Sequence, residues 1–301
     1  METQLPSSIP GLRDFVSDSE RFQDVFDTAF LPNNDGVTKL ERWFETDFEE
    51  EVVMKMKESF STESELRLLG IGTGNGRPDL MMLEKFLRHF TKIHYTVVEP
   101  DQPAFIEFKQ TVEKSSSLSN VVFDWRNTTI EEYWKKSEDS PGFDFISMVH
   151  TAYYLKDVGR TMDRLLASLT VGGVSLLVHK SGENKTSEFA RQLPWLSKPS
   201  HMSPGRLIRD AAHRANQRRL RVIPFPAVID VTSVFDVGSD VGPKLMDFLT
   251  QGAYFCKTVP EDVSEATTEI LRSLITKSDD GERSLISNDF EIIEICKNAS
   301  S

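Results

Sequence analysis

The sequence predicts an α/β fold in which a parallel sheet carries helices on both faces. Between residues 66 and 180, apolar runs typical of buried strands alternate with segments of helical periodicity in the order βαβαβαβαβ. The first apolar run, 66–69, leads into a turn rich in glycine, and the second, 94–98, ends in the acidic residue Glu99. These observations predict a doubly wound sheet that binds a nucleoside cofactor at the carboxyl ends of its strands.

The glycine-rich turn carries the first half of this cofactor prediction. It contains Gly70, Gly72, Gly74 and Gly76, and a helix is expected to start near Asp79. Glycines let the backbone approach a ligand closely, and the free N–H groups of the following helix favour an anionic or carboxylate group. The spacing is GxGxG rather than GxGxxG, which favours S-adenosylmethionine over NAD. The alternative is a strand-to-helix connection that is rich in glycine for structural reasons alone.

Polar residues at the ends of the next strands carry the second half. Glu99 is placed to accept hydrogen bonds from both hydroxyls of a ribose; its structural alternative is a solvated carboxylate at a strand end. After the third strand, 120–125, the hydroxyl of Thr129 is expected near an adenine amino group, or else at the start of a helix. The fourth strand, 144–150, ends at His150, on the side of the sheet that faces the ligand.

The remaining elements follow from composition and periodicity. Before the glycine turn, Phe-rich helices are expected on both sides of a Pro-Asn-Asn-Asp-Gly turn; between 79 and 180, helices alternate with the strands; past 180 the alternation loosens. The expected helices are 12–31, 37–59, 79–91, 103–113, 157–169, 203–216, 240–251 and 260–275. A Gly172-Gly173 turn precedes a fifth strand at 174–179, 220–234 is strand-like, and a last strand at 289–295 returns to the sheet.

Composition limits the classes of partner. The chain of 301 residues has 47 acidic and 35 basic residues, a formal charge of −12, which disfavours nucleic acid as a partner and suits a small neutral or cationic substrate. The basic cluster 214–221 is interpreted as the solvated face of a helix. Cys256 and Cys296 are expected to be reduced and buried, with neither a disulfide nor a metal site. No signal peptide or membrane-spanning run is recognised, so a cytoplasmic protein is expected.

Four segments resemble a known family. They are Leu69 to Gly76, Val97 to Pro100, Met148 to Asp157 with its Tyr-Tyr-Leu-Lys-Asp run, and Asp247 to Thr250, which reads Asp-Phe-Leu-Thr. In these segments the chain resembles histamine N-methyltransferases, which are class I S-adenosylmethionine-dependent enzymes. The resemblance runs from about residue 12 to residue 295. The Tyr-Tyr-Leu-Lys-Asp and Asp-Phe-Leu-Thr segments are more specific to the family than the glycine turn.

The resemblance implies a seven-stranded Rossmann-like methyltransferase sheet with a smaller substrate-binding domain, in a protein that works as a monomer. The pattern of elements along the chain places the cofactor-binding domain at 1–200 plus 286–301 and the substrate domain at 201–285. Gly72 and Glu99 are implied to hold S-adenosylmethionine. A cofactor-contacting Gln of that family aligns with Ala104, but the nearby Gln102 is taken as the candidate. Val149, at the end of the fourth strand, is assigned to the cofactor site and also maps to the lining of the amine pocket. The amine pocket would be lined by His150 and, among the aromatic residues, by Phe15, Tyr154, Trp195 and Phe255.

The polar substrate contacts of that family are altered in this chain. Asp35 lies where the family has a Glu, His150 stands at the position of a Gln, and Asn288 lies near that of an Asn. His150, Asp35 or a bound water are the candidates for the base that frees the lone pair of an amine before it attacks the sulfonium methyl. The expected reaction is N-methylation of a small amine or imidazole such as histamine. The alternatives are methylation of another amine, a carboxylate or a hydroxyl, and a non-catalytic protein that binds the cofactor.

Overall fold

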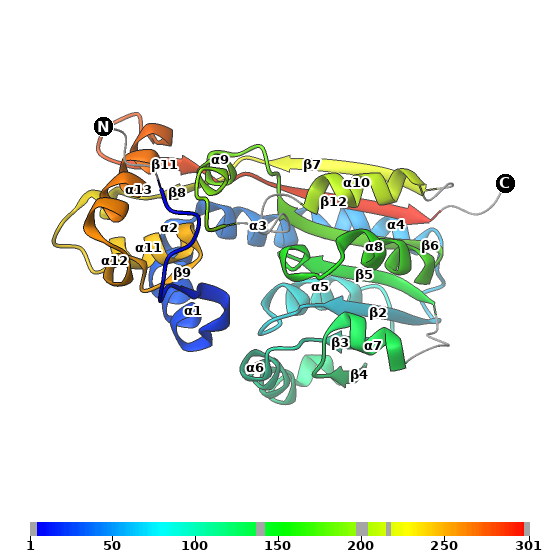
Figure 1. Cartoon of the computed structure of the whole chain (residues 1–301). Coiled ribbons are helices and arrows are strands. Elements are labelled where there is room, and N and C mark those ends of the chain that lie inside the picture. The colour runs from blue at the N-terminus through cyan, green and yellow to red at the C-terminus, as the bar shows by residue number, and fades with distance from the viewer. Residues whose placement is uncertain (1–4, 137–141, 197–203, 215–217, 298–301) are drawn as a thin grey trace. The chain divides into compact units, whose positions relative to one another are not determined.

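The computed structural model describes residues 5–136, 142–196, 204–214 and 218–297. The chain forms two compact units, and each is treated by itself (Figure 1). The larger unit comprises 40–179, 204–223 and 291–301, and the smaller comprises 1–39, 180–203 and 224–290. These units differ in their boundaries from the functional domains expected from the sequence, and the confinement of substrate binding to 201–285 stays a prediction.

The larger unit is built on a seven-stranded sheet, which confirms the predicted fold class. Each neighbouring pair from β4 to β6 is parallel, with Gly70 beside Val97 on one side and Ser147 on the other. The β12 arrow runs opposite to that of β7, so the sheet is mixed (Figure 1). The order is β4 (Val121–Arg126), β3 (Lys92–Val98), β2 (Glu65–Ile71), β5 (Phe143–Val149), β6 (Leu169–Lys180), β12 (Phe290–Lys297) and β7 (Arg218–Phe225).

Helices cover both faces of this sheet because its central strands are apolar on both sides. On one face, α7, α8 and α10 bury a cluster that includes Leu69, Ile146 and Leu177. On the other face, the rings of Phe48, Phe86 and Phe145 meet edge to face. The helices are α5 (Arg77–Leu87), α6 (Gln102–Glu113), α7 (Ile130–Lys136), α8 (Val158–Ser168) and α10 (Pro204–Arg214), with short turns η4 (Ser116–Leu118) and η5 (Ala152–Tyr154).

The smaller unit is a helical layer with two short sheets around its own apolar core, which includes Phe30, Phe189 and Phe255. Its sheets pair β1 (Arg13–Asp14) with β9 (Gly252–Ala253), and β11 (Ser284–Ser287) with β10 (Thr276–Lys277) and β8 (Val228–Asp230). Its helical segments are η1 (Phe15–Ser17), α1 (Ser19–Val25), η2 (Phe26–Phe30), α2 (Leu31–Asn33), α9 (Lys185–Arg191), η7 (Thr232–Phe235), α11 (Val241–Thr250), α12 (Phe255–Thr258) and α13 (Glu261–Leu274).

The order βαβαβαβαβ between residues 65 and 180 is confirmed, but several local predictions are wrong. The helix expected over 12–31 is divided, because Asp18 caps α1 after a separate turn, and η2 has π-helical geometry. The turn expected at 32–36 is partly helical: Pro32 is accommodated in the first turn of α2, and the next helix, α3 (Asp35–Thr46), begins at Asp35. The helix expected over 37–59 is also divided: after α3 the chain continues through η3 (Glu49–Val53) and α4 (Met54–Lys57).

Three further predictions need correction. Gly172 and Gly173 lie inside β6, where Gly172 has a φ of 81° and the register with β5 shifts, so the glycines make an irregularity rather than end the strand. Arg218 to Arg221 belong to β7 and not to a helix; 203 and 215–217 lie outside the described residues. Both cysteines are free, but Cys256 is exposed and Cys296 is half-buried. In the part of the chain that is described, no helix is long and apolar enough to span a bilayer.

A buried polar cluster joins the first crossover helix to the sheet. Asp79, in the first turn of α5, accepts a hydrogen bond from the Tyr95 hydroxyl of β3 and a longer one, 3.4 Å, from Ser147 of β5. Burial raises the pKa of Asp79 from its ordinary 3.8 to about 7, against the opposing effect of these hydroxyls; the charge of Glu99 adds to the rise. Between about pH 4 and pH 7, the folded protein therefore holds a proton here that the unfolded chain has already released.

This proton makes the stability of the fold depend on pH. Because the folded-state pKa is raised, the free energy of unfolding should fall as pH rises through that window. The change Asp79→Asn removes the titrating proton, so the stability of this variant relative to wild type should rise by about 2–3 kcal/mol from about pH 5 to about pH 8. Urea unfolding at both pH values measures it. Asp210→Asn, at an exposed position of α10, is the control; equal pH dependence in both variants would contradict the assignment.

Candidate functional site

The carboxyl ends of three neighbouring strands bring the predicted cofactor residues to one edge of the sheet. β2 lies between β3 and β5, so the glycine turn, Glu99 and His150 follow adjacent strand ends. The chain leaves β2 toward β3 on one side and later reaches β5 on the other side, which makes this the topological switch point of the sheet. Ligands of doubly wound folds bind at this point.

Gly72 and Gly74 give the turn after β2 its shape, since both have positive φ, 62° and 55°. Gly72 donates its N–H to the Val98 carbonyl at 2.8 Å, and its carbonyl accepts the Thr151 hydroxyl at 3.0 Å. A Cβ built on Gly74 meets no atom within 4 Å, so the turn is open at this residue. The other three glycines face protein: a Cβ would strike Tyr95 at Gly70, Thr151 at Gly72 and Phe108 at Gly76.

Glu99 is joined directly to the glycine turn. Its carboxylate accepts the Gly74 N–H at 2.7 Å through one oxygen and the Asp101 N–H at 2.7 Å through the other. The residue is only 5% exposed, and burial raises the pKa of its carboxyl above the ordinary range, while the two N–H donors oppose the rise. A carboxylate offers about four lone-pair sites, so each oxygen retains capacity for one more donor.

This arrangement fits S-adenosylmethionine. The free lone pairs of Glu99 can accept the two ribose hydroxyls, and the open backbone at Gly74 leaves room for the methionine end. Two further predicted cofactor contacts lie at the starts of helices. Gln102 is exposed at the start of α6, and the Thr129 hydroxyl accepts the N–H of Glu132 at 3.3 Å at the start of α7. Their cofactor contacts stay predictions.

Two residues at this edge were missed by the sequence analysis. Asn127, just after β4, donates its side-chain amide to the Glu99 carbonyl at 2.8 Å, and Thr151 binds the carbonyls of Gly72 and Val149 at 3.0 Å each. Both follow strand ends, as Glu99 does, so the same criterion would have found them. They fix the backbone on both sides of the switch point.

His150 occupies an unusual backbone conformation. Its φ is 52°, in the left-handed region that is costly for a residue with a Cβ, and its N–H donates to the Val178 carbonyl at 2.8 Å. Such outliers gather at functional sites, where the surrounding structure holds them. The exposed imidazole places Nδ1 3.1 Å from the Tyr153 hydroxyl, and Tyr154, also exposed, packs edge-on against Tyr153. Val149 is half-buried at the end of β5.

The other predicted aromatic residues lie in the smaller unit. Phe15 is fully buried, with its ring 6.3 Å from that of Phe248. Trp195 stacks on Phe255 at 5.8 Å and donates its indole N–H to the Thr250 carbonyl at 3.3 Å. Trp195 and Phe255 belong to the apolar core of this unit together with Phe248, the ring that Phe15 contacts.

Asp35 and Asn288, also in the smaller unit, are engaged by protein groups. The two Asp35 oxygens accept the Val228 N–H at 2.7 Å and pair with the Lys39 ammonium at 2.8 Å. The side-chain oxygen of Asn288 accepts the Thr186 hydroxyl at 3.0 Å. Each Asp35 oxygen thus already has one protein partner.

Lys180, which the sequence analysis did not select, has unusual surroundings at the end of β6. Its ammonium lies 5.2 Å from the ring centre of Phe248, and burial lowers the pKa of this lysine to about 8. It can therefore exchange a proton near neutral pH. Among the described residues, no group of three or more His, Cys, Asp or Glu side chains gathers in a metal-binding arrangement.

Comparison with known proteins agrees with this geometry. A family model described as a methyltransferase domain matches residues 44–216. The histamine N-methyltransferase of Xenopus tropicalis is 30% identical over 266 residues, which cover 85% of this chain and 88% of the relative. The histamine N-methyltransferase of Rattus norvegicus is 29% identical over 225 residues, which cover 71% of this chain and 74% of the relative. The YcgJ protein of Bacillus subtilis shares the fold, with a TM-score of 0.51 and 19% identity over 82% of this chain and 100% of that chain. The chain thus belongs to the histamine N-methyltransferase family and is an S-adenosylmethionine-dependent methyltransferase.

Proposed function

We propose that this methyltransferase transfers a methyl group to a nitrogen of a small amine or imidazole, such as histamine. The observation that carries the proposal is the meeting of Gly74, Glu99 and His150 at adjacent strand ends. The first two form the cofactor cradle, and His150 holds a strained conformation on the neighbouring strand. The relatives named histamine N-methyltransferase support the same class of substrate.

The cofactor supplies an activated methyl group on a sulfonium, so the protein is required mainly to position the nucleophile and to exclude water. Glu99 and the N–H groups of the turn fix the cofactor, and Thr151 and Asn127 fix the backbone around them. His150 orients the substrate nitrogen through a hydrogen bond. Tyr154, exposed after the fourth strand of the sheet, holds a cationic substrate tail by cation–π attraction, about 0.5–2 kcal/mol for a good contact. The substrate contacts predicted in the smaller unit are Phe15, Trp195 and Phe255, of which Phe15 and Phe255 are 0% exposed.

An amine that is protonated in water must lose a proton before it can attack. His150 is the first candidate for the base because its imidazole is exposed at the strand end. Asp35 is the second, although Lys39 and the Val228 N–H already occupy its oxygens. We further propose that the protein acts as a cytoplasmic monomer, with residues 201–285 as the core of the substrate domain, as the family resemblance implies.

Glu99 provides the test of the cofactor site. The change Glu99→Ala removes both ribose acceptors, so the affinity for S-adenosylmethionine should fall by about 100-fold while the protein stays folded. Because burial raises the pKa of Glu99, the wild-type affinity should also weaken as the pH is lowered, starting at a higher pH than for an ordinary glutamate. Calorimetry measures both effects. Asp124→Asn on the neighbouring strand β4 is the control, and equal affinities of Glu99→Ala and wild type would rule out the site.

His150 provides the test of the substrate site. Removal of the imidazole in His150→Ala should lower kcat/KM for the preferred amine by about 10- to 100-fold, with cofactor affinity within about twofold of wild type. His150→Gly should in addition raise the melting temperature slightly, because glycine relieves the positive φ. Release of S-adenosylhomocysteine across a panel of amines, carboxylates and alcohols measures turnover. His213→Ala, at an exposed position of α10, is the control.

The panel also decides between the possible substrate classes. Turnover of a carboxylate or alcohol but of no amine would contradict the proposal, as would cofactor binding without any product. The change His150→Gln restores the amide that the family has at this position. A rise in histamine turnover in this variant would show that the wild-type site prefers a different nucleophile.

A further inference from the structure

The carboxylate of Asp247 is the centre of a buried polar network in the smaller unit. This residue, in α11, is 1% exposed and opens the Asp-Phe-Leu-Thr segment that had no assigned role. Its two oxygens accept the Tyr254 N–H at 2.9 Å and the Phe255 N–H at 2.8 Å. Burial raises the pKa of Asp247, against the opposing effect of its hydrogen-bond donors. The carboxylate therefore holds the chain where α12 begins.

The connection that it holds is strained. Gln251 and Tyr254, on the two sides of β9, have φ values of 52° and 55°, and neither is glycine. Asp247 binds the backbone at the second of these residues and at the next, Phe255. The position of the Phe255 ring, on which Trp195 stacks, thus depends on a carboxylate eight residues earlier in the chain.

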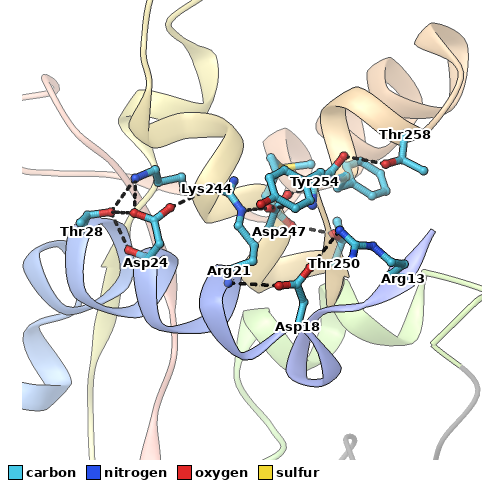
Figure 2. Close-up of polar contacts among 12 residues, drawn as sticks. Arg13, Asp18, Arg21, Asp24, Thr28, Lys244, Asp247, Thr250, Tyr254 and Thr258 are labelled. Carbon is cyan, nitrogen blue, oxygen red and sulfur yellow. Dashed lines mark hydrogen bonds and ion pairs between the residues drawn. The ribbon is translucent and has the colours of Figure 1, made fainter. Parts of the chain in front are cut away.

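Arg21 of α1 binds the same carboxylate. Its Nε donates to Asp247 at 2.7 Å, its guanidinium lies 4.6 Å from the ring centre of Tyr254, and Nη1 pairs with Asp24 at 2.9 Å (Figure 2). The backbone adds to this connection, because the Phe15 N–H donates to the Gln251 carbonyl at 3.0 Å. Arg21 is the positively charged partner that this nearly inaccessible carboxylate requires.

We propose that Asp247 and Arg21 are positioning residues for substrate binding: together they fix Phe255 on one side and the N-terminal segment that carries Phe15 on the other. The inference rests on the proposed function, in which the predicted substrate contacts include these two aromatic side chains, both 0% exposed in this structure. It assigns no contact with substrate to Asp247 or Arg21 themselves. Their loss should therefore weaken substrate binding and leave the cofactor cradle of the larger unit unchanged.

The test uses the full-length protein with Arg21→Met and Asp247→Asn. Lys244→Met is the matched control, because Lys244 also joins α11 to α1 (Figure 2). Its ammonium contacts Asp24 and Thr28, each at 2.8 Å. Amide hydrogen exchange of residues 251–258 should accelerate about tenfold in the first two variants and less than about twofold in the control. KM for the preferred amine should rise about tenfold, with kcat and cofactor affinity within about threefold of wild type.

Each outcome decides the inference. Arg21→Lys restores a cation and should recover part of the KM change, even if Asp247→Asn fails to fold. Unchanged exchange in Arg21→Met overturns the positioning role, and faster exchange with an unchanged KM overturns its connection with substrate. If the wild-type protein methylates no amine, the proposed function fails, and hydrogen exchange alone decides whether the pair positions Phe255.

Discussion

The hydrogen bond between the Gly74 N–H and the Glu99 carboxylate is the interaction on which the cofactor site depends. It joins the turn after the first strand of the βαβ unit to the end of the second, so each of them fixes the other. The parallel register makes the bond geometrically available, because Ile71 and Val98 end their strands side by side. Burial is unfavourable for the carboxylate charge, and the two N–H donors offset that cost. The Gly74 and Asp101 N–H groups therefore hold the Glu99 carboxylate in place.

Buried side chains of the larger unit hold the glycine turn that makes this bond. Tyr95 fills the space beside Gly70 and donates to the buried Asp79, and Ser147 extends the contact to β5. Three of the four glycines of the turn are thus explained at least partly by neighbouring side chains, and only Gly74 faces open space. A glycine-rich signature therefore combines two requirements: room for the cofactor and room for the protein that holds the turn.

The smaller unit holds its aromatic side chains with few regular elements. Its strands are short, and the start of α12 is set by a buried carboxylate and a guanidinium rather than by a sheet. Lys180 adds a cation to the Phe248 ring within the same unit. The family resemblance implies different polar residues at Asp35 and His150, so the choice of nucleophile is the central question about this enzyme.

The sequence by itself determined the order of strands and helices in the sheet, the glycine turn and the acid at the next strand end, because these depend on local periodicity and short spacings. The tertiary structure alone decided which glycine faces open space, which donors bind Glu99, and that Asp35 is already paired with Lys39 and Val228. It also decided the role of Asp247, whose partner Arg21 is 226 residues away in the chain. Contacts at such separations leave no local pattern, because they are set by how the elements pack.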